Sequence, residues 1–246
     1  MSETISNAQI RLLTKEIVDL VLTNDGREVV KSLKSQLDGK CPFSKLDLLG
    51  REIGLAGATA DTNRRQEFLE AFDRIIEHNA MGGYVIVGQA LIYFSQNNLD
   101  EVMKKSREYI IKGDKWYVCD IIGERAIGQA LVNHFDETVP SLEKFLRDEN
   151  RWVKRSAGVA IHFFSKRVQD EPRKTQSLLD LVEPHMEEKQ VDVVKGIGWG
   201  LKTIGRHHPD ILGGFLKKQI DAEKKISKLM LRKARTYLEE NKSYEK

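Results

Sequence analysis

One carboxylate in this sequence lies among aromatic and basic side chains at helical spacing. Trp116 and Asp120 are four residues apart, so on a helix they share one face. A carboxylate placed in this way can stabilise developing positive charge or orient a water molecule. Arg155 follows 35 residues later and can pair with Asp120 across neighbouring helices, which would keep the carboxylate ionised. A structural ion pair and a catalytic carboxylate are compatible, so both interpretations stay open.

A second aromatic side chain stands between cations. Lys195, Trp199, Lys202 and Arg206 follow one another at steps of four, three and four residues, the spacing of one helix face. An exposed indole among positive charges is a good platform for a sugar or a base. The alternative is that Trp199 packs between helix pairs while the lysines extend around it.

Basic residues are concentrated near the end of the chain. The net charge is only +3, but between residues 195 and 235 few acidic residues oppose the lysines and arginines. Such an excess favours a polyanion, because each phosphate contact releases condensed counterions. The alternative is a solvated, lysine-rich face at a chain end. The predicted nucleic-acid contacts are Arg151, Lys154, Lys195, Lys202, Arg206, Lys228, Arg232 and Arg235.

The elements that position these side chains are predicted to be helices. Apolar residues recur at helical spacing, separated by short stretches with Gly, Pro, Asn or Asp, and strand patterns are nearly absent. Residues 80–83 are expected to form a loop between two helices. The predicted helices span residues 6–23, 26–37, 42–54, 62–79, 84–96, 98–112, 115–134, 137–148, 150–168, 172–187, 190–207, 209–220 and 222–240.

The later helices repeat. The segments around Arg155, Lys195 and Arg232 each show an apolar residue, the basic residue, and a small residue one or two positions further on. The separations of 40 and 37 residues between these basic residues fit HEAT-type helix pairs. Extending this register back by 35 residues reaches Asp120. The expected fold is all-α: a right-handed superhelical solenoid of HEAT-like antiparallel helix pairs with a concave basic groove, residues 1–246 forming a single domain.

The helix predicted over 150–168 should present two faces. Val153, Ala157, Ala160, Ile161 and Phe164 form an apolar stripe for the core. Arg155 and Gly158 fall on another face. We therefore expect Arg155 to point away from the core, with Gly158 leaving room for something to approach its base. The alternative is an arginine without consequence, or one that bridges neighbouring helices.

Composition excludes several classes of protein. No apolar run approaches the roughly 20 residues needed to span a bilayer, and the charged N-terminus lacks the core of a signal peptide, so a cytoplasmic location is expected. Cys41 and Cys119 are too few for a disulfide framework or a zinc site, and we expect both to be reduced. The six histidines show no metal-binding spacing.

Three motifs together resemble the AlkD-like DNA alkylation-repair glycosylases, which are built from HEAT-like repeats. They are Trp116-x-x-x-Asp120, Trp152-x-x-Arg155 and Ile197-Gly198-Trp199-Gly200-Leu201, within about residues 114–208. The resemblance implies a monomer that acts on double-stranded DNA at the nucleoid, with no cofactor and no metal. Its reaction would be hydrolysis of the N-glycosidic bond of cationic alkylpurines, of the 3-methyladenine and 7-methylguanine type, without base flipping.

The resemblance also implies roles for four residues. Trp116 and Trp199 would pack on the deoxyribose, Asp120 would stabilise oxocarbenium character and position water, and Arg155 would hold a phosphate. An alkylated purine is already a cationic leaving group, so a carboxylate and two indole faces suffice without a general acid.

Two other functions remain open. One is a non-catalytic DNA-binding HEAT protein for distorted or branched DNA, and the other is a protein-interaction scaffold. The first third of the chain resembles the glycosylases less: residues 27–49 contain no Tyr or Trp that could serve as the family's aromatic DNA contact.

Overall fold

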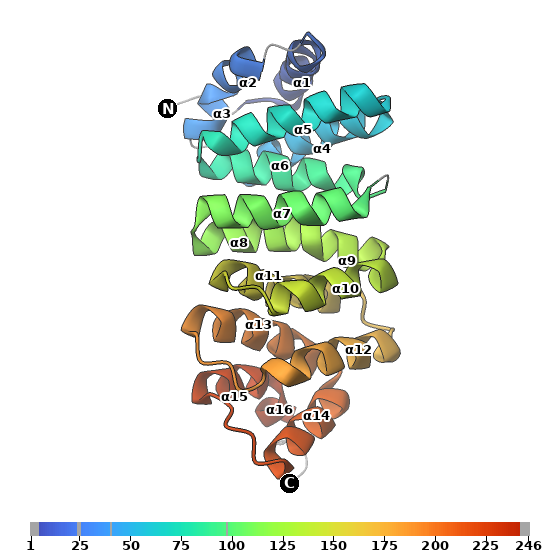
Figure 1. Cartoon of the computed structure of the whole chain (residues 1–246), viewed down its shortest axis with the longest axis vertical. Coiled ribbons are helices and arrows are strands. Elements are labelled where there is room, and N and C mark those ends of the chain that lie inside the picture. Colours follow the sequence, from blue (N-terminus) through green and yellow to red (C-terminus); the bar gives the residue numbers. More distant parts are fainter. Residues whose placement is uncertain (1–4, 24–25, 40, 97, 242–246) are drawn as a thin grey trace. The chain divides into compact units, whose positions relative to one another are not determined.

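Every regular element in the described part of the chain is a helix. The computed structural model describes residues 5–23, 26–39, 41–96 and 98–241, and Figure 1 shows these helices in chain order. This confirms the predicted all-α class. Contacts group the chain into two compact units, Met1–Gly113 and Asp114–Lys246. The expectation of a single domain stays a prediction.

In the first unit α4 packs closely on α6, while α1 flanks α4 and α5 contacts α6. Glycine makes the close approach possible, because a Cβ on Gly54 would lie 2.6 Å from the carbonyl oxygen of Ala90. The helices of this unit are α1 (Asn7–Leu22), α2 (Gly26–Ser32), α3 (Lys34–Asp38), α4 (Phe43–Thr59), α5 (Thr62–Glu77), α6 (Met81–Phe94) and α7 (Leu99–Gly113).

The predicted loop at residues 80–83 is wrong, because α6 begins at Met81. Gly82 and Gly83 are buried inside its first turn. A Cβ on Gly82 would lie 2.6 Å from the carbonyl oxygen of Gln36, so glycine here lets α3 and α6 approach. These glycines serve helix packing rather than a turn.

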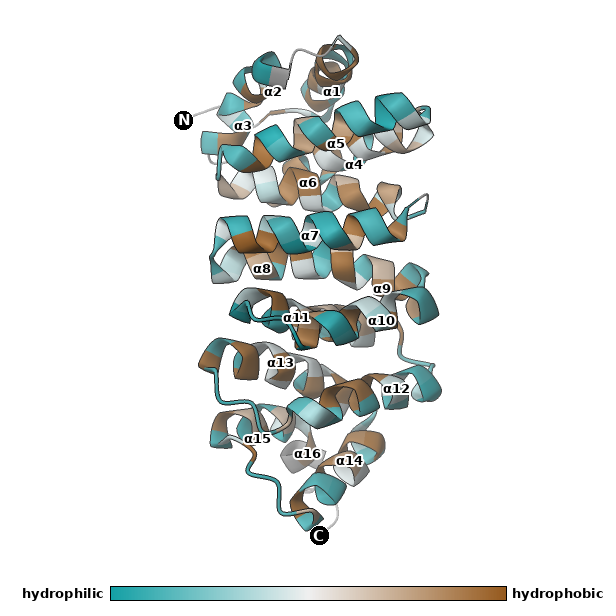
Figure 2. Cartoon of the chain, viewed as in Figure 1, coloured by the Kyte–Doolittle hydropathy of each residue, from teal (hydrophilic) through white to brown (hydrophobic). Residues whose placement is uncertain are grey.

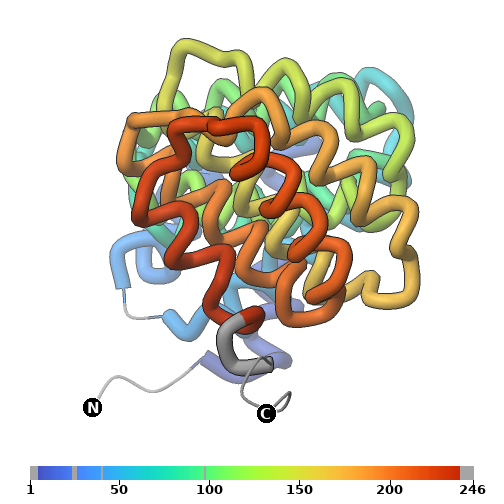
Figure 3. The backbone as a smooth tube through the Cα atoms, turned by 90° about the horizontal axis from the view of Figure 1, so that it is seen from below, coloured from blue at the N-terminus to red at the C-terminus, as the bar shows by residue number. Residues whose placement is uncertain are grey.

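The second unit has its helices in two layers. In the first layer α11 lies between α8–η1–α9 and α13, and α13 also contacts α15; the second layer contains α10, α12 and α14. Figure 3 lets the reader follow α13 to α16 as a tube coloured orange to red. The bounds are α8 (Trp116–Ile122), η1, a π-helix (Gly123–Gly128), α9 (Gln129–Asn133), α10 (Phe135–Leu146), α11 (Arg151–Arg167), α12 (Pro172–Val182), η2, a 3₁₀ helix (Glu183–His185), α13 (Val191–His207), α14 (Pro209–Asp221), α15 (Lys228–Ala234) and α16 (Thr236–Asn241).

The last predicted helix, 222–240, begins only at Lys228 and is then broken once. Glu223 has φ 54°, outside the range of a right-handed helix, and the chain re-enters helix only at Lys228. Ser227 caps the new helix, since its Oγ accepts a hydrogen bond of 3.1 Å from the amide of Met230. The break at Arg235 separates α15 from α16.

Burial follows the predicted stripe of α11. Val153, Ala157, Ala160, Ile161 and Phe164 are all buried, which confirms them as core residues. Figure 2 shows the apolar and polar faces of the helices by hydropathy. Among the described residues, none of the helices combines the length and apolar character that crossing a bilayer requires.

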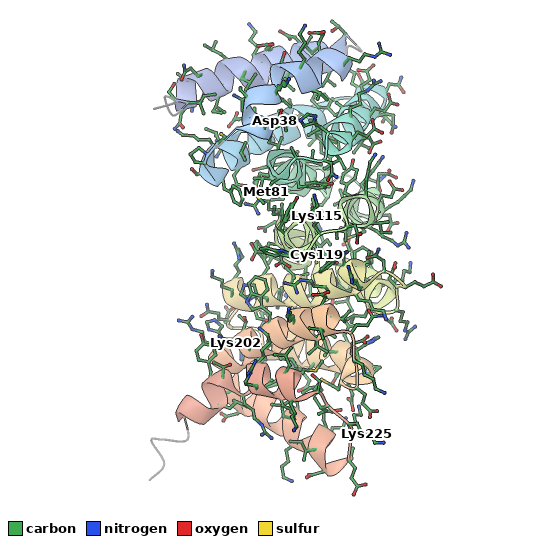
Figure 4. The ribbon with its side chains drawn as sticks, turned by 90° about the vertical axis from the view of Figure 1, so that its left-hand side faces the viewer. Asp38, Met81, Lys115, Cys119, Lys202 and Lys225 are labelled. Carbon is green, nitrogen blue, oxygen red and sulfur yellow. The ribbon has the colours of Figure 1, made fainter. Side chains whose placement is uncertain are left out.

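The two cysteines are free in this structure. Cys119 is buried, and Figure 4 labels it on α8. Burial, and next the charge of Asp120, raise the pKa of the Cys119 thiol well above its usual value. The thiol is therefore a protonated core side chain at neutral pH.

Candidate active site

Asp120 and Arg155 form a two-pronged ion pair between α8 and α11. Arg155 Nε donates to Asp120 Oδ1 at 2.8 Å, and Nη2 donates to Oδ2 at 2.9 Å. Arg155 Nη1 donates to the carbonyl oxygen of Asp192 at 3.3 Å. Burial lowers the pKa of Arg155, but the hydrogen bonds and charge of Asp120 outweigh it and raise this pKa above its usual value. The guanidinium is therefore held ionised and in one orientation.

The environment of Arg155 differs from the one expected from helix periodicity. Arg155 is only 8% exposed, so the prediction that it points away from the core is wrong. Gly158 leaves no room for a ligand either, because a Cβ there would collide with the backbone of Gly196. A Cβ on Gly196 would in turn lie 2.6 Å from the carbonyl oxygen of Arg155. The two glycines let the backbones of α11 and α13 come into contact, and this contact helps to bury Arg155.

Trp116 is the exposed aromatic residue beside this pair. It lies at the start of α8, one turn before Asp120, and is 59% exposed. Its indole makes an edge-on contact with Tyr117, with ring centroids 6.0 Å apart. A large aromatic side chain so exposed beside a carboxylate is available to a ligand.

Trp152, by contrast, is structural. It is 6% exposed, and its Nε1 donates a hydrogen bond of 2.7 Å to Asp114 Oδ1. This bond ties the start of the second unit to α11. The motif containing Trp152 and Arg155 thus supplies one buried anchor and one buried ion-pair partner.

Trp199 has a partner that the sequence did not indicate. Its indole stacks on the imidazole of His162, with ring centroids 4.0 Å apart and planes inclined by 23°. The predicted neighbours Lys202 and Arg206 instead lie over the ring of Tyr237, at 5.4 and 5.6 Å. Trp199 is half-buried, so the alternative of packing between helices is partly realised.

His162 and Glu124 both lie in surroundings that oppose charge. Burial, helped by Lys166 and Arg167, lowers the pKa of His162 to about 4. Burial also raises the pKa of Glu124; Arg125 opposes this shift and Asp120 adds to it. The His162 Nε2 to Glu124 Oε1 distance is 4.0 Å. The first layer therefore carries a second carboxylate, one helical turn beyond Asp120, next to a neutral imidazole.

The predicted phosphate contacts fall into two groups. Two of them lie near carboxylates. Arg151 Nε is 4.0 Å from Asp192 Oδ2, with its guanidinium over the ring of Trp152, and Lys154 Nζ is 3.6 Å from Glu188 Oε2. The others have no carboxylate within 4.0 Å among the side chains that the structure describes: Lys195, Lys202, Arg206, Lys228, Arg232 and Arg235. Figure 4 labels Lys202 and Lys225, which lie on opposite sides of the second unit.

Lys233 belongs with the unpaired cations, although its spacing did not point to it. Its aliphatic chain lies against Gly198, where a Cβ would be 2.9 Å from Lys233 Cδ. Burial and then the charges of Lys202, Arg155, Arg232 and Lys195 lower the pKa of Lys233. A lysine whose charged form is disfavoured by neighbouring cations would be stabilised by an anion.

Metal ligands do not cluster in the described part of the chain: no group of three or more His, Cys, Asp or Glu side chains there could hold an ion.

Comparisons with known proteins identify the family. A solved structure, the Pseudomonas fluorescens alkylpurine DNA glycosylase AlkC bound to DNA containing an abasic site analogue, shares the fold with a TM-score of 0.61 at 17% identity. The match covers 93% of this chain and 62% of that one, so this chain spans less than two thirds of its length. No curated protein matches the sequence. Residues 55–238, well over half of the chain, match the model of one family, and the chain belongs to that family of DNA alkylation repair enzymes.

Proposed function

We propose that the protein is a DNA glycosylase that hydrolyses the N-glycosidic bond of cationic alkylated purines, such as 3-methyladenine and 7-methylguanine, in duplex DNA. The observation that carries this proposal is Asp120: a carboxylate fixed by Arg155, one helical turn from the exposed indole of Trp116. Membership of the repair family and the fold shared with an alkylpurine glycosylase support it.

The helix pairs form a right-handed solenoid in this proposal, with the first layer lining a concave groove for the duplex. The unpaired cations support this assignment, because Lys195 and Arg232 are exposed on α13 and α15 of that layer. Phosphates would replace the missing acidic partners and release counterions. The protein would act without base flipping, as a cytoplasmic monomer at the nucleoid.

Asp120 would stabilise the positive charge that develops on the sugar as the bond to the base breaks. Each carboxylate oxygen accepts one hydrogen bond from Arg155 and keeps lone-pair capacity for a water molecule. The fixed orientation matters, because a preorganised charge needs no rearrangement when the transition state forms. Trp116 and Trp199 would place electron-rich faces beside the same sugar.

Arg155 takes a different part from the one that the family resemblance implied. Its donors are directed to Asp120 and to the Asp192 carbonyl, and little of the side chain reaches solvent. We therefore assign it to holding Asp120, and assign phosphate contacts to the unpaired cations Lys195, Lys202, Arg206, Arg232 and Lys233.

The proposal is tested by comparing base release from three duplexes, carrying 7-methylguanine, hypoxanthine or no lesion. A site that relies on a cationic leaving group should release 7-methylguanine and leave the neutral hypoxanthine in place. Release of both at similar rates would contradict this mechanism, since the lesion's charge would then contribute nothing. Heat-treated protein controls for spontaneous depurination.

A second function is favoured by one specific observation. The pair between Asp120 and Arg155 satisfies both groups without any ligand, as in a structural ion pair, which suits a non-catalytic protein for distorted or branched DNA. This function predicts binding whose affinity falls steeply with salt, with no base released from any lesion. Weak duplex binding whose affinity does not change with salt concentration would instead favour a protein-interaction scaffold.

A further inference from the structure

The imidazole of His162 stacks on the indole of Trp199, which is half-buried. The ring centroids are 4.0 Å apart at 23°, so the imidazole covers one face of the indole. His162 comes from α11 and Trp199 from α13. The contact therefore links two helices of the first layer and restricts rotation of the indole about its side-chain bonds.

The imidazole is held by a hydrogen bond to α13. His162 Nδ1 lies 2.6 Å from Thr203 Oγ1, and this hydroxyl is also 3.1 Å from the carbonyl oxygen of Trp199. His162 Nε2 faces Glu124 Oε1 at 4.0 Å. The ring is therefore fixed on the same helix as the indole that it covers.

Charge matters as much as orientation in this stack. The groups that face His162 are Glu124 from η1, Lys166 and Arg167 from its own helix, and Thr203 from α13. Burial and the two cations lower the pKa of His162 to about 4, so the imidazole is neutral at physiological pH. A neutral ring places no positive charge against the indole and so does not weaken the attraction of its opposite face for a cation.

We propose that His162 is a positioning residue, which covers one face of Trp199 and turns the other toward the deoxyribose of a bound alkylated nucleotide. This inference rests on the proposed function. It adds that Trp199 presents one fixed face, whereas the exposed indole of Trp116 is free to adjust. His162 does not touch the sugar, and its effect passes through the indole.

Two variants separate stacking from a general structural effect. His162→Ala uncovers the second indole face, whereas His162→Phe keeps a flat ring on the indole and loses only the hydrogen bond to Thr203. At protein concentrations that saturate the DNA, His162→Ala should release 7-methylguanine about tenfold more slowly. His162→Phe should recover most of that loss, and duplex affinity should change little in either variant.

A fluorescence measurement tests the inference independently of catalysis. In a Trp116→Phe background the buried Trp152 is shielded from acrylamide, so quenching reports on Trp199. His162→Ala should increase the quenching of Trp199, and His162→Phe should return it to the level of the unaltered protein. A duplex with an abasic-site analogue should protect Trp199 from acrylamide in the proteins whose residue 162 is His or Phe, because a ring then covers the indole face that is turned away from the DNA.

The outcomes are distinguishable. Base release by the unaltered protein at a rate that His162→Ala leaves unchanged would overturn the positioning role and spare the glycosylase proposal. No base release, together with DNA protection of Trp199 that depends on residue 162, would contradict the glycosylase proposal and uphold the placement of the indole face against DNA. DNA that fails to protect Trp199 in any variant would overturn the inference.

Discussion

Breaking the ion pair between Asp120 and Arg155 by removing one partner should strongly destabilise the second unit. The perturbation is Arg155→Met, which keeps much of the aliphatic chain and removes three hydrogen bonds. The side chains of Arg155 and Asp120 are only 10% and 17% exposed, so the carboxylate left behind is poorly solvated. Removing one partner of a buried pair costs about 3–5 kcal/mol, and the residual exposure of these side chains places this case at about 3 kcal/mol.

Urea unfolding followed by tryptophan fluorescence measures this cost. All three tryptophans, at positions 116, 152 and 199, lie in the second unit, so the signal reports on that unit alone. The matched control is Arg147→Met, because Arg147 pairs with Glu143 on an exposed helix surface. Exposed pairs contribute about 0–1 kcal/mol, so this variant should unfold close to the original midpoint.

A double variant completes the test. Asp120→Asn combined with Arg155→Met should be less destabilised than the sum of the two single changes, because each single change leaves an unpaired group. A loss of unfolding free energy in Arg155→Met no larger than that in Arg147→Met would refute a buried, coupled pair, and so would single-variant losses that simply add in the double variant.

Three further predictions concern the same layer. Gly196→Ala should destabilise the second unit because its Cβ would press on the Arg155 backbone, whereas Gly214→Ala, with nothing within 4 Å, should stabilise it by about 0.5–1 kcal/mol; equal urea midpoints would contradict this. The pKa of His162 is about 4 in the folded protein and 6.5 in a free imidazole, so protonation of the unfolded chain lowers the free energy of unfolding as the pH falls below 6.5, by roughly 2 kcal/mol at pH 5. Unfolding midpoints measured over a pH series should show this decrease in the unaltered protein, and His162→Phe should lack it. Lys195→Glu should weaken duplex binding and reduce the slope of log affinity against log salt concentration by about 1, whereas Lys217→Glu on α14 should change neither. Equal slopes in the two variants would show that Lys195 does not contact the DNA.

Local patterns predicted most of the helices but not the role of glycine. The apolar stripe of α11 is buried as its periodicity required. The pair at Gly82 and Gly83 looked like a loop, because glycine at close helix crossings and glycine in turns have the same local signature. Only the neighbouring backbone of α3 distinguishes them.

The sequence predicted which residues belong to the candidate site better than it predicted their contacts. The 35-residue spacing indicated a pairing of Asp120 with Arg155, and the structure has it. The close packing of α11 on α13 buries Arg155 and stacks His162 on Trp199. The spacing of residues along one helix does not show how closely two helices pack. Lys233 was not among the predicted nucleic-acid contacts, because its place among the cations depends on how α15 packs on α13.

The central claim is that a single carboxylate stabilises the breaking glycosidic bond, and release of 7-methylguanine from duplex DNA by Asp120→Asn tests it most directly. Under saturating protein, the account predicts a rate at least about 100-fold below that of the unaltered protein, because a preorganised charge at the reacting centre is lost. Asp180→Asn, on the second-layer helix α12, should retain the original rate. An Asp120→Asn protein that remains folded, binds the duplex and releases the base as fast as the unaltered protein would contradict the account.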